Sequence, residues 1–344
     1  MTDTAQLVEA FDSRVQRREQ RREFFKAVVG AAAIGAGAFA FASAAEAQAV
    51  TDNDILNFAL NLEYLEANFY YYAVFGTPIP ATSITGVGTA VPTDSLSLNA
   101  GAHAVPFTDA VVAQYAREIA ADELAHVNFL RSALTSAAVA QPQIDVGITP
   151  NGAFSSAARA AGIIGATSDT APTFFDPYAS DENFLLGAFI FEDVGVTAYK
   201  GASPLITSKA YLEAAAGILA VEAYHASIVR TVLYAKGIGT PATATTPAVV
   251  AQPALITNAG KISDARDSLD GTSDLDQGIA TDNSAVGARS NIAPLDGNGL
   301  AFSRSTGQVL NIVYLNRAAV TLGGFFPQGV NGSIRTSANN VPAA

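Results

Sequence analysis

Two short motifs in this chain pair a glutamate with a histidine at the same spacing: Glu123-x-x-His126 and Glu222-x-x-His225. On a helix, this spacing places the carboxylate and the imidazole on one face, about one turn apart. Both side chains of a motif can therefore bind the same metal ion. Because the motif occurs twice, the sequence favours a site for a pair of ions.

Two further glutamates, Glu63 and Glu192, each interrupt an otherwise apolar helical stripe. An unpaired carboxylate buried in such a stripe would cost on the order of several kcal/mol, so both need a charge partner. One glutamate from each of two helices and Glu-x-x-His from each of two others is the ligand set of di-iron and di-manganese carboxylate bundles. The predicted metal ligands, in chain order, are Glu63, Glu123, His126, Glu192, Glu222 and His225.

The charges of this set match a two-metal centre. Four carboxylates offset two divalent cations, and one imidazole completes the coordination of each ion. The chain has no cysteine, which leaves oxygen and imidazole nitrogen as the strong metal ligands. The predicted cofactor is two divalent metal ions, with iron preferred to manganese.

Several residues near these ligands have more than one interpretation. In a metal-free alternative, His126 and His225 are bundle histidines salt-linked to neighbouring glutamates. Glu66 is an alternative or additional ligand, although it lies on the adjacent stripe. Asp122 is either a surface residue or a hydrogen-bond acceptor for a ligand histidine. His103 is expected in an exposed loop. The helices also carry tyrosines, expected mainly to pack, with hydrogen bonding or redox chemistry at the metals as the alternative: Tyr64, Tyr70, Tyr71, Tyr72, Tyr115, Tyr199 and Tyr224.

Composition narrows the class of protein further. The chain has 344 residues, 49% of them hydrophobic, and a formal net charge of −12. This content supports a sizeable folded core. A strongly acidic surface repels nucleic acid and attracts cations. Metal ions are therefore the expected partners, and nucleic acid is not.

Apolar periodicity predicts four helices that would position the ligands. They run from about 54 to 75, 109 to 134, 181 to 200 and 209 to 236. Thr51 with Asp54 is spaced as a capping box, and Gly76 and Gly237 are stop signals. The link between the last two helices is short, which makes them antiparallel neighbours. The other two connections are long, at 76–108 and 135–180.

The remainder of the chain is less regular. Residues 239–302 are rich in Asp, Ser, Thr and Gly and are expected to form a polar, partly disordered surface loop. A Ser305/Gln308 capping box predicts a fifth helix from Ser305 to about Leu322. The residues after it form a turn-rich tail.

The first 49 residues have the order of an export signal. Arg21-Arg22 and Lys26 precede an uncharged Ala/Gly-rich run, and Ala47-Gln48-Ala49 resembles a cleavage site. The segment resembles a twin-arginine signal, which carries folded proteins across the membrane. A periplasmic or otherwise exported protein is expected, in contact with the membrane only during export. The alternative is an uncleaved membrane anchor.

The stretches 61–70 and 122–126 look like the first helix and the second-helix ligand motif of ferritin-like proteins. With the leader and the segment 323–332, the chain resembles the ferritin-like family that includes plant desiccation-related proteins and their exported bacterial relatives. The resemblance implies an all-α fold: a ferritin-like four-helix bundle with long connections, plus the fifth C-terminal helix. The expected organisation is a signal peptide at 1–49, the bundle at 50–238, the polar loop at 239–302, and the C-terminal helix and tail at 303–344.

Two functions of different classes follow. The first is an exported two-metal carboxylate protein that oxidises iron or reacts with oxygen or peroxide in stress defence, with manganese catalase-like chemistry as a variant. The second is a non-enzymatic protein that protects against desiccation or other stress, or a structural bundle. A metal-free bundle acting only as a binding module is a third hypothesis.

Overall fold

A computed structural model of the protein describes residues 50–92, 99–242, 248–284 and 287–341. The sequence predicts a leader at residues 1–49, and this segment lies outside the described residues. The segment from residue 50 onward groups as one compact unit.

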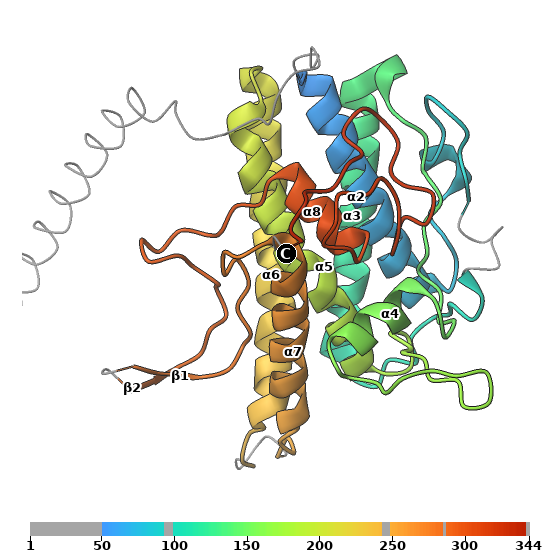
Figure 1. Cartoon of the computed structure of the whole chain (residues 1–344). Coiled ribbons are helices and arrows are strands. Elements are labelled where there is room, and N and C mark those ends of the chain that lie inside the picture. The colour runs from blue at the N-terminus through green and yellow to red at the C-terminus, as the bar shows by residue number, and fades with distance from the viewer. Residues whose placement is uncertain (1–49, 93–98, 243–247, 285–286, 342–344) are drawn as a thin grey trace, which may run out of the picture. The chain divides into compact units, whose positions relative to one another are not determined.

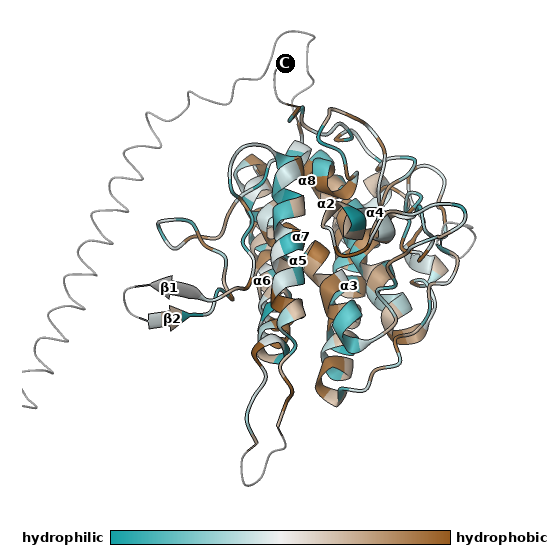
Figure 2. Ribbon diagram, turned by 60° about the horizontal axis from the view of Figure 1, so that its bottom comes forward, coloured by the Kyte–Doolittle hydropathy of each residue, from teal (hydrophilic) through white to brown (hydrophobic). Residues whose placement is uncertain are grey.

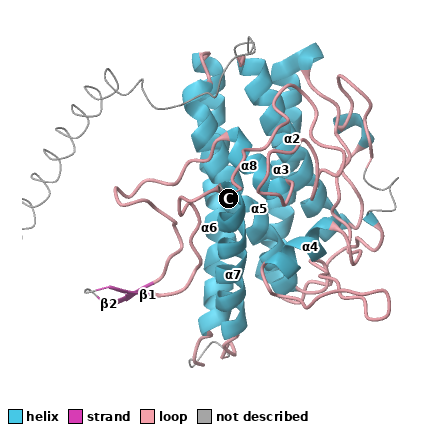
Figure 3. Ribbon diagram, viewed as in Figure 1, coloured by secondary structure: helices cyan, strands magenta, loops and turns pink. Residues whose placement is uncertain are grey.

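Long helices dominate the described part of the chain, as Figures 1 and 3 show: α2 (Asp52–Phe75), α3 (Ala110–Leu134), α5 (Asp181–Ala202) and α6 (Lys209–Ile238). The main partner of α2 is α3, and the main partner of α5 is α6. The two pairs meet through contacts of α2 with α5 and of α3 with α6. The predicted all-α bundle is confirmed.

Local signals in the sequence fix the ends of these helices. The Thr51 side chain accepts from the backbone N–H of Asp54, whose side chain accepts from the N–H of Thr51, so the predicted capping box forms. Gly76 ends α2 with φ of 68°, a left-handed conformation that glycine adopts without steric cost. Ser180 and Ser208 cap α5 and α6 in the same way that Thr51 caps α2. The four predicted helices therefore begin and end within about two residues of their predicted limits.

The apolar stripes of the helices meet in one core. Phe69 on α2 stacks on Phe184 of α5, with ring centroids 5.8 Å apart and an interplanar angle of 15°. Phe325, from the C-terminal tail, packs edge-on against Phe191 of α5.

In length and composition α6 would suffice to cross a membrane, but it buries Glu222, His225 and Arg230 in the bundle. It is a core helix of this fold.

The prediction of an irregular loop at 239–302 is wrong over part of its length. The structure contains α7 (Pro253–Asp270), which packs on α5 and α6, and a short hairpin of β1 (Asp282–Ser284) and β2 (Gly287–Arg289). The buried side of α7 is Leu255, Ala259, Ile262, Ser263, Arg266 and Asp270. This stripe is half polar, and much of α7 is hydrophilic in Figure 2. Periodicity of apolar residues therefore could not reveal it.

The predicted C-terminal helix is correct at its start and too long at its end. It is α8 (Thr306–Val313), and the Ser305/Gln308 capping box forms as predicted. The helix stops because Leu315 adopts a left-handed φ of 53°. The Asn311 side chain holds this turn by donating to the carbonyl oxygens of Asn316 and Ala338.

The long connection at 135–180 also contains a helix that was not predicted, α4 (Ala153–Ala160). It starts after Gly152, which provides no side-chain cap. Instead Asp145 accepts from the backbone N–H of Ala153. This cap is distant in sequence, so the usual start signal is missing.

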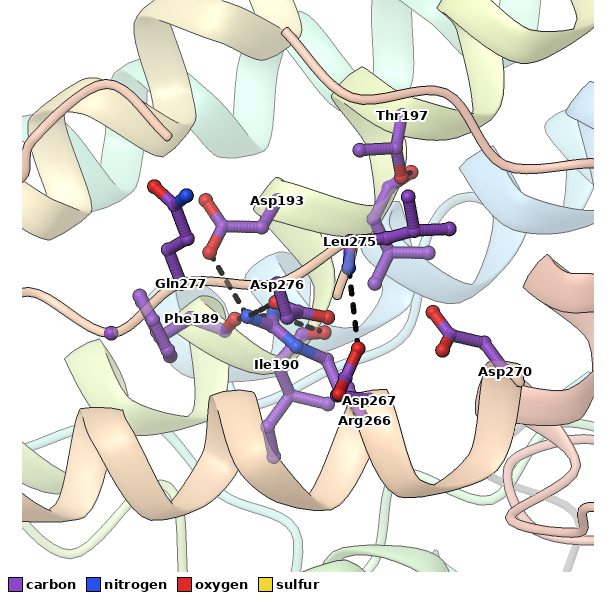
Figure 4. Close-up of polar contacts among 12 residues, drawn as sticks. Phe189, Ile190, Asp193, Thr197, Arg266, Asp267, Asp270, Leu275, Asp276 and Gln277 are labelled. Carbon is purple, nitrogen blue, oxygen red and sulfur yellow. Dashed lines mark hydrogen bonds and ion pairs between the residues drawn. The ribbon is translucent and has the colours of Figure 1, made fainter. Parts of the chain in front are cut away.

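A buried network of charges fastens the chain after α7 onto the bundle (Figure 4). Arg266 on α7 lies between the carboxylates of Asp193 on α5 and Asp276 in the segment that follows α7. Arg304 pairs with Asp276 and with Asp270, its Nε lying 2.6 Å from Asp270 Oδ2. Arg230 on α6 lies 2.7 Å from Asp193 and also donates to the carbonyl oxygens of Gly278 and Asn291. Three arginines thus meet three aspartates, and the charges within this network balance.

Candidate metal centre

The structure brings all six predicted ligands to one place in the middle of the bundle. Glu63 comes from α2, Glu123 and His126 from α3, Glu192 from α5, and Glu222 and His225 from α6. All six are buried, and the most exposed of them, His126, keeps only 8% of its surface. Within the described residues, groups of potential metal-binding side chains occur here and nowhere else.

The ligand atoms form two overlapping groups. The first contains Glu63, Glu123, His126 and Glu222, and the second contains Glu123, Glu192, Glu222 and His225. In each group one ligand atom per residue lies within 4.8 Å of the others. Glu123 and Glu222 belong to both groups, so they would be shared if each group held an ion. Glu63 with His126, and Glu192 with His225, each belong to one group.

The imidazole nitrogens point at the carboxylates. Nδ1 of His126 lies 3.2 Å from Glu63 Oε2 and 3.6 Å from Glu222 Oε1. Nδ1 of His225 lies 3.0 Å from Glu123 Oε1 and 3.7 Å from Glu192 Oε2. The two rings are 6.3 Å apart between centroids. Each group thus has oxygen and nitrogen donors converging on one small volume.

Most of these converging ligand atoms have no hydrogen-bond partner that would explain their burial. Both carboxylate oxygens of Glu123 and of Glu222, Oε2 of Glu192 and Nδ1 of His225 are buried with no hydrogen-bond partner in the described part of the chain. Buried polar atoms are nearly always partnered, because an unpartnered one costs about 1 to 3 kcal/mol or more. Most of these atoms belong to the two groups, and carboxylate with imidazole suits iron or manganese. The donor set therefore fits metal ions.

A comparison with known proteins agrees with this geometry. The model of the ferritin-like domain family matches residues 51–235, which is more than half of the chain. The chain belongs to the ferritin-like family. The matched region contains α2, α3, α5 and α6 almost completely, and with them all six ligands.

Two curated relatives of this ferritin-like chain are from plants. It is 32% identical over 187 residues to the desiccation-related protein PCC13-62 of Craterostigma plantagineum, covering 54% of this chain and 53% of that protein. It therefore spans about half the length of that relative. It is 24% identical over 286 residues to the ferritin-like catalase Nec2 of Nesocodon mauritianus, covering 82% of this chain and 84% of that protein.

The carboxylates of the ferritin-like centre differ in how they hold protons. Burial raises the pKa of Glu63 to about 7 and that of Glu192 to about 8, against the lowering effect of His126 and His225 respectively. Burial also acts to raise the pKa of Glu123, but the adjacent imidazoles of His126 and His225 outweigh it and lower that pKa to about 2. The pKa of Glu222 lies well above its usual range because of burial and the charge of Glu123.

The pKa values of the two histidines are raised, because nearby carboxylates stabilise the protonated imidazoles. Burial opposes their charge, but the Glu63 and Glu123 carboxylates outweigh it and raise the pKa of His126 to about 11. The pKa of His225 rises to about 9 because its contacts with Glu123 and Glu192 also outweigh burial. A metal ion binds ionised carboxylate and neutral imidazole, so it must displace these protons.

Residues around the ligands orient them. Asp122, predicted as a possible acceptor for a ligand histidine, has Oδ2 3.2 Å from Nε2 of His225. The hydroxyl of Tyr70 on α2 donates to Glu192 on α5, and the hydroxyl of Tyr199 on α5 donates to Glu63 on α2. Both tyrosines are buried. These two therefore have the hydrogen-bonding role that the sequence left as the alternative to packing.

A signal for the two tyrosines was present in the sequence. Each lies two helical turns after a single glutamate, at the same spacing on α2 and on α5. The other tyrosines behave differently: Tyr64 is buried and donates to Val139 O at 3.2 Å, and Tyr224 is 69% exposed. His103 is exposed in a loop, as predicted, with Nε2 3.9 Å from Asp176.

Proposed function

We propose that this ferritin-like protein is an exported two-metal protein that oxidises ferrous iron or reacts with oxygen or peroxide. The observation that carries the proposal is the set of buried ligand atoms that face one another without hydrogen-bond partners. A bundle kept only for its shape would gain stability by replacing such carboxylates with apolar side chains. The name of one relative, a ferritin-like catalase that aligns over most of both chains, supports a reaction with peroxide.

The residues have distinct parts in this proposal. Glu63 with His126, and Glu192 with His225, would each hold one ion at its end of the centre, while Glu123 and Glu222 would bridge. Two redox-active ions held together can exchange electrons with oxygen or peroxide and share the change of charge. Tyr70 and Tyr199 fix the terminal carboxylates from the opposite helix. Burial of the ligands keeps bulk water away from the reacting atoms.

Metal loading tests the proposal directly. Metal-free protein is loaded anaerobically with Fe(II), and oxygen is then admitted while the absorbance of oxidised iron is followed. In parallel, the Mn(II) form is given peroxide and its consumption is measured. We expect turnover with at least one metal, and its loss in Glu123→Ala/His126→Ala. Absence of any reaction with both metals would overturn the proposal.

Export is part of the proposal and has its own test. The twin arginines, Arg21 and Arg22, belong to the leader that lies outside the described residues. A twin-arginine route requires both, so Arg21→Lys/Arg22→Lys should keep the protein in the cytoplasm of a host with this pathway. Fractionation with an antibody measures its location. Export of the variant at the wild-type level would argue for another route or an anchor.

A second function is favoured by the similarity to the desiccation-related protein PCC13-62, which covers about half of that relative. In this alternative the metal centre serves only stability, and protection under drying comes from the protein as a whole. Replacing Glu123 and His126 would then lower stability without removing protection. Loss of protection together with the metal would instead support the redox function.

A further inference from the structure

The metal centre has an internal two-fold relationship between its helices. Tyr70 on α2 donates a hydrogen bond to Glu192 on α5, and Tyr199 on α5 donates one to Glu63 on α2. In both helices the glutamate precedes the tyrosine, and each glutamate lies beside the tyrosine of the other helix. The two helices therefore run antiparallel, with the centre where they cross. The Glu-x-x-His motifs of α3 and α6 repeat this relationship: His225 lies against Glu123, and His126 against Glu222.

Glu66 breaks this symmetry. It lies one turn after Glu63, and the corresponding position one turn after Glu192 is Gly195. A Cβ atom on Gly195 would lie 2.3 Å from Glu222 Oε2 and 3.5 Å from Glu66 Oε1. Real Cβ atoms do not approach so closely, so any other side chain at position 195 would displace Glu222. Gly195 therefore leaves the space in which the carboxylates of Glu66 and Glu222 approach each other.

Glu66 is a buried carboxyl group without a hydrogen-bond partner in the described part of the chain. The residue is 5% exposed, and no hydrogen bond or ion pair to its carboxylate occurs in the described part of the chain. A void of about 20 Å³ beside it is lined by Glu66, Gly195 and apolar side chains of α2, α5, α8 and the C-terminal tail. This is room for about one water molecule, so the Glu66 side chain is loosely packed on that side.

We propose that Glu66 is a fifth carboxylate of the metal centre, which turns towards Glu222 on the side of Gly195 and binds an ion next to it. Glu66 lies beside the two groups of ligand atoms, so joining them requires a rotation of its side chain. This inference rests on the proposed metal function. The two ions are then inequivalent, because only one side of the two-fold has this extra ligand.

The test uses the variant Glu66→Gln, which keeps the shape of the side chain and removes its charge. Metal-free wild type and variant are titrated with Mn(II) by calorimetry. We expect the affinity for one of two ions to fall about ten- to a hundredfold, the range for groups that support a metal centre. Glu118→Gln, at an exposed position of α3, is the matched control and should change nothing.

Crystals of the Mn(II) form give a readout independent of affinity. Anomalous diffraction locates the ions, and we expect the Glu66 carboxylate within bonding distance of one of them. Circular dichroism of the metal-free variants checks that they fold.

The outcomes separate the two levels of the proposal. A wild type that binds two Mn(II) ions, with unchanged affinity in Glu66→Gln and Glu66 remote from both ions, overturns the role of Glu66 alone. A wild type that binds no metal overturns the metal centre itself.

Discussion

Asp122 on α3 and His225 on α6 are joined across the bundle, with Asp122 Oδ2 3.2 Å from His225 Nε2. Because Nε2 faces Asp122, Nδ1 of the same ring faces Glu123 and Glu192. The residue at the corresponding place before Glu222 is Val221, which cannot accept a hydrogen bond. His225 is therefore oriented by a carboxylate, and His126 is not oriented in this way.

Removing Asp122 should weaken metal binding without unfolding the protein. Its side chain is 42% exposed, so Asp122→Ala leaves no buried cavity. Loss of a partner that orients a ligand histidine typically lowers metal affinity about ten- to a hundredfold. Titration of the metal-free variant with Mn(II) measures the change, and Glu118→Ala on the same helix is the control. An affinity equal to that of the wild type would show that Asp122 is only a surface residue.

Tyr70→Phe and Tyr199→Phe should each destabilise the metal-free protein. Either change leaves a buried carboxylate oxygen, on Glu192 or Glu63, without its donor. The expected loss in the free energy of unfolding is about 1 to 3 kcal/mol, measured by urea denaturation. Tyr224→Phe, at an exposed position of α6, is the control. A loss no larger than that of the control would mean that water replaces the hydroxyl.

The stability of the metal-free protein should fall as the pH rises. The folded-state pKa values of Glu63 and Glu192, about 7 and about 8, and of His126 and His225, about 11 and about 9, all exceed their ordinary values. Each group therefore stabilises the fold fully below its unfolded pKa and loses that contribution as pH rises through its folded pKa. Bound metal reverses the trend, because it requires the deprotonated ligands.

Thermal unfolding of the chelator-treated and the Mn(II)-loaded protein tests this between about pH 5 and pH 9. We expect the two melting temperatures to diverge with increasing pH, the metal-free one falling and the loaded one rising. Curves that run parallel over this interval would contradict the proposed exchange of protons for metal.

The candidate metal centre was predictable because its information is local. A Glu-x-x-His spacing on a helix fixes two ligands on one face, and a glutamate inside an apolar stripe marks the inner side of its helix. The four predicted helices and the six ligands needed no knowledge of distant contacts. Tyr70 and Tyr199 were harder, because an apolar stripe accommodates a tyrosine whether or not its hydroxyl finds a partner.

The region after α6 was not predictable for the opposite reason. Arg266 and Asp270 look like surface residues of a polar segment, and their burial depends on Asp193, Asp276 and Arg304, which are distant in sequence. A buried arginine gives no periodic apolar signal. Its partners become apparent only when the fold brings them together.

This network makes Arg304 a sensitive position outside the candidate metal centre. Its guanidinium is fully buried between Asp270 and Asp276 and also donates to Thr197 on α5. Arg304→Ala removes one side of a buried ion network and leaves two aspartates without it, which costs about 3 to 5 kcal/mol. Urea denaturation of the metal-loaded protein measures the loss, and the exposed Arg317→Ala should stay within about 0.5 kcal/mol of wild type.

Limited trypsin digestion distinguishes release of the segment between α7 and α8 from global unfolding. Early cleavage in that segment, with the bundle intact, indicates release. A variant within about 1 kcal/mol of wild type that resists trypsin would show that the segment is held by its other contacts.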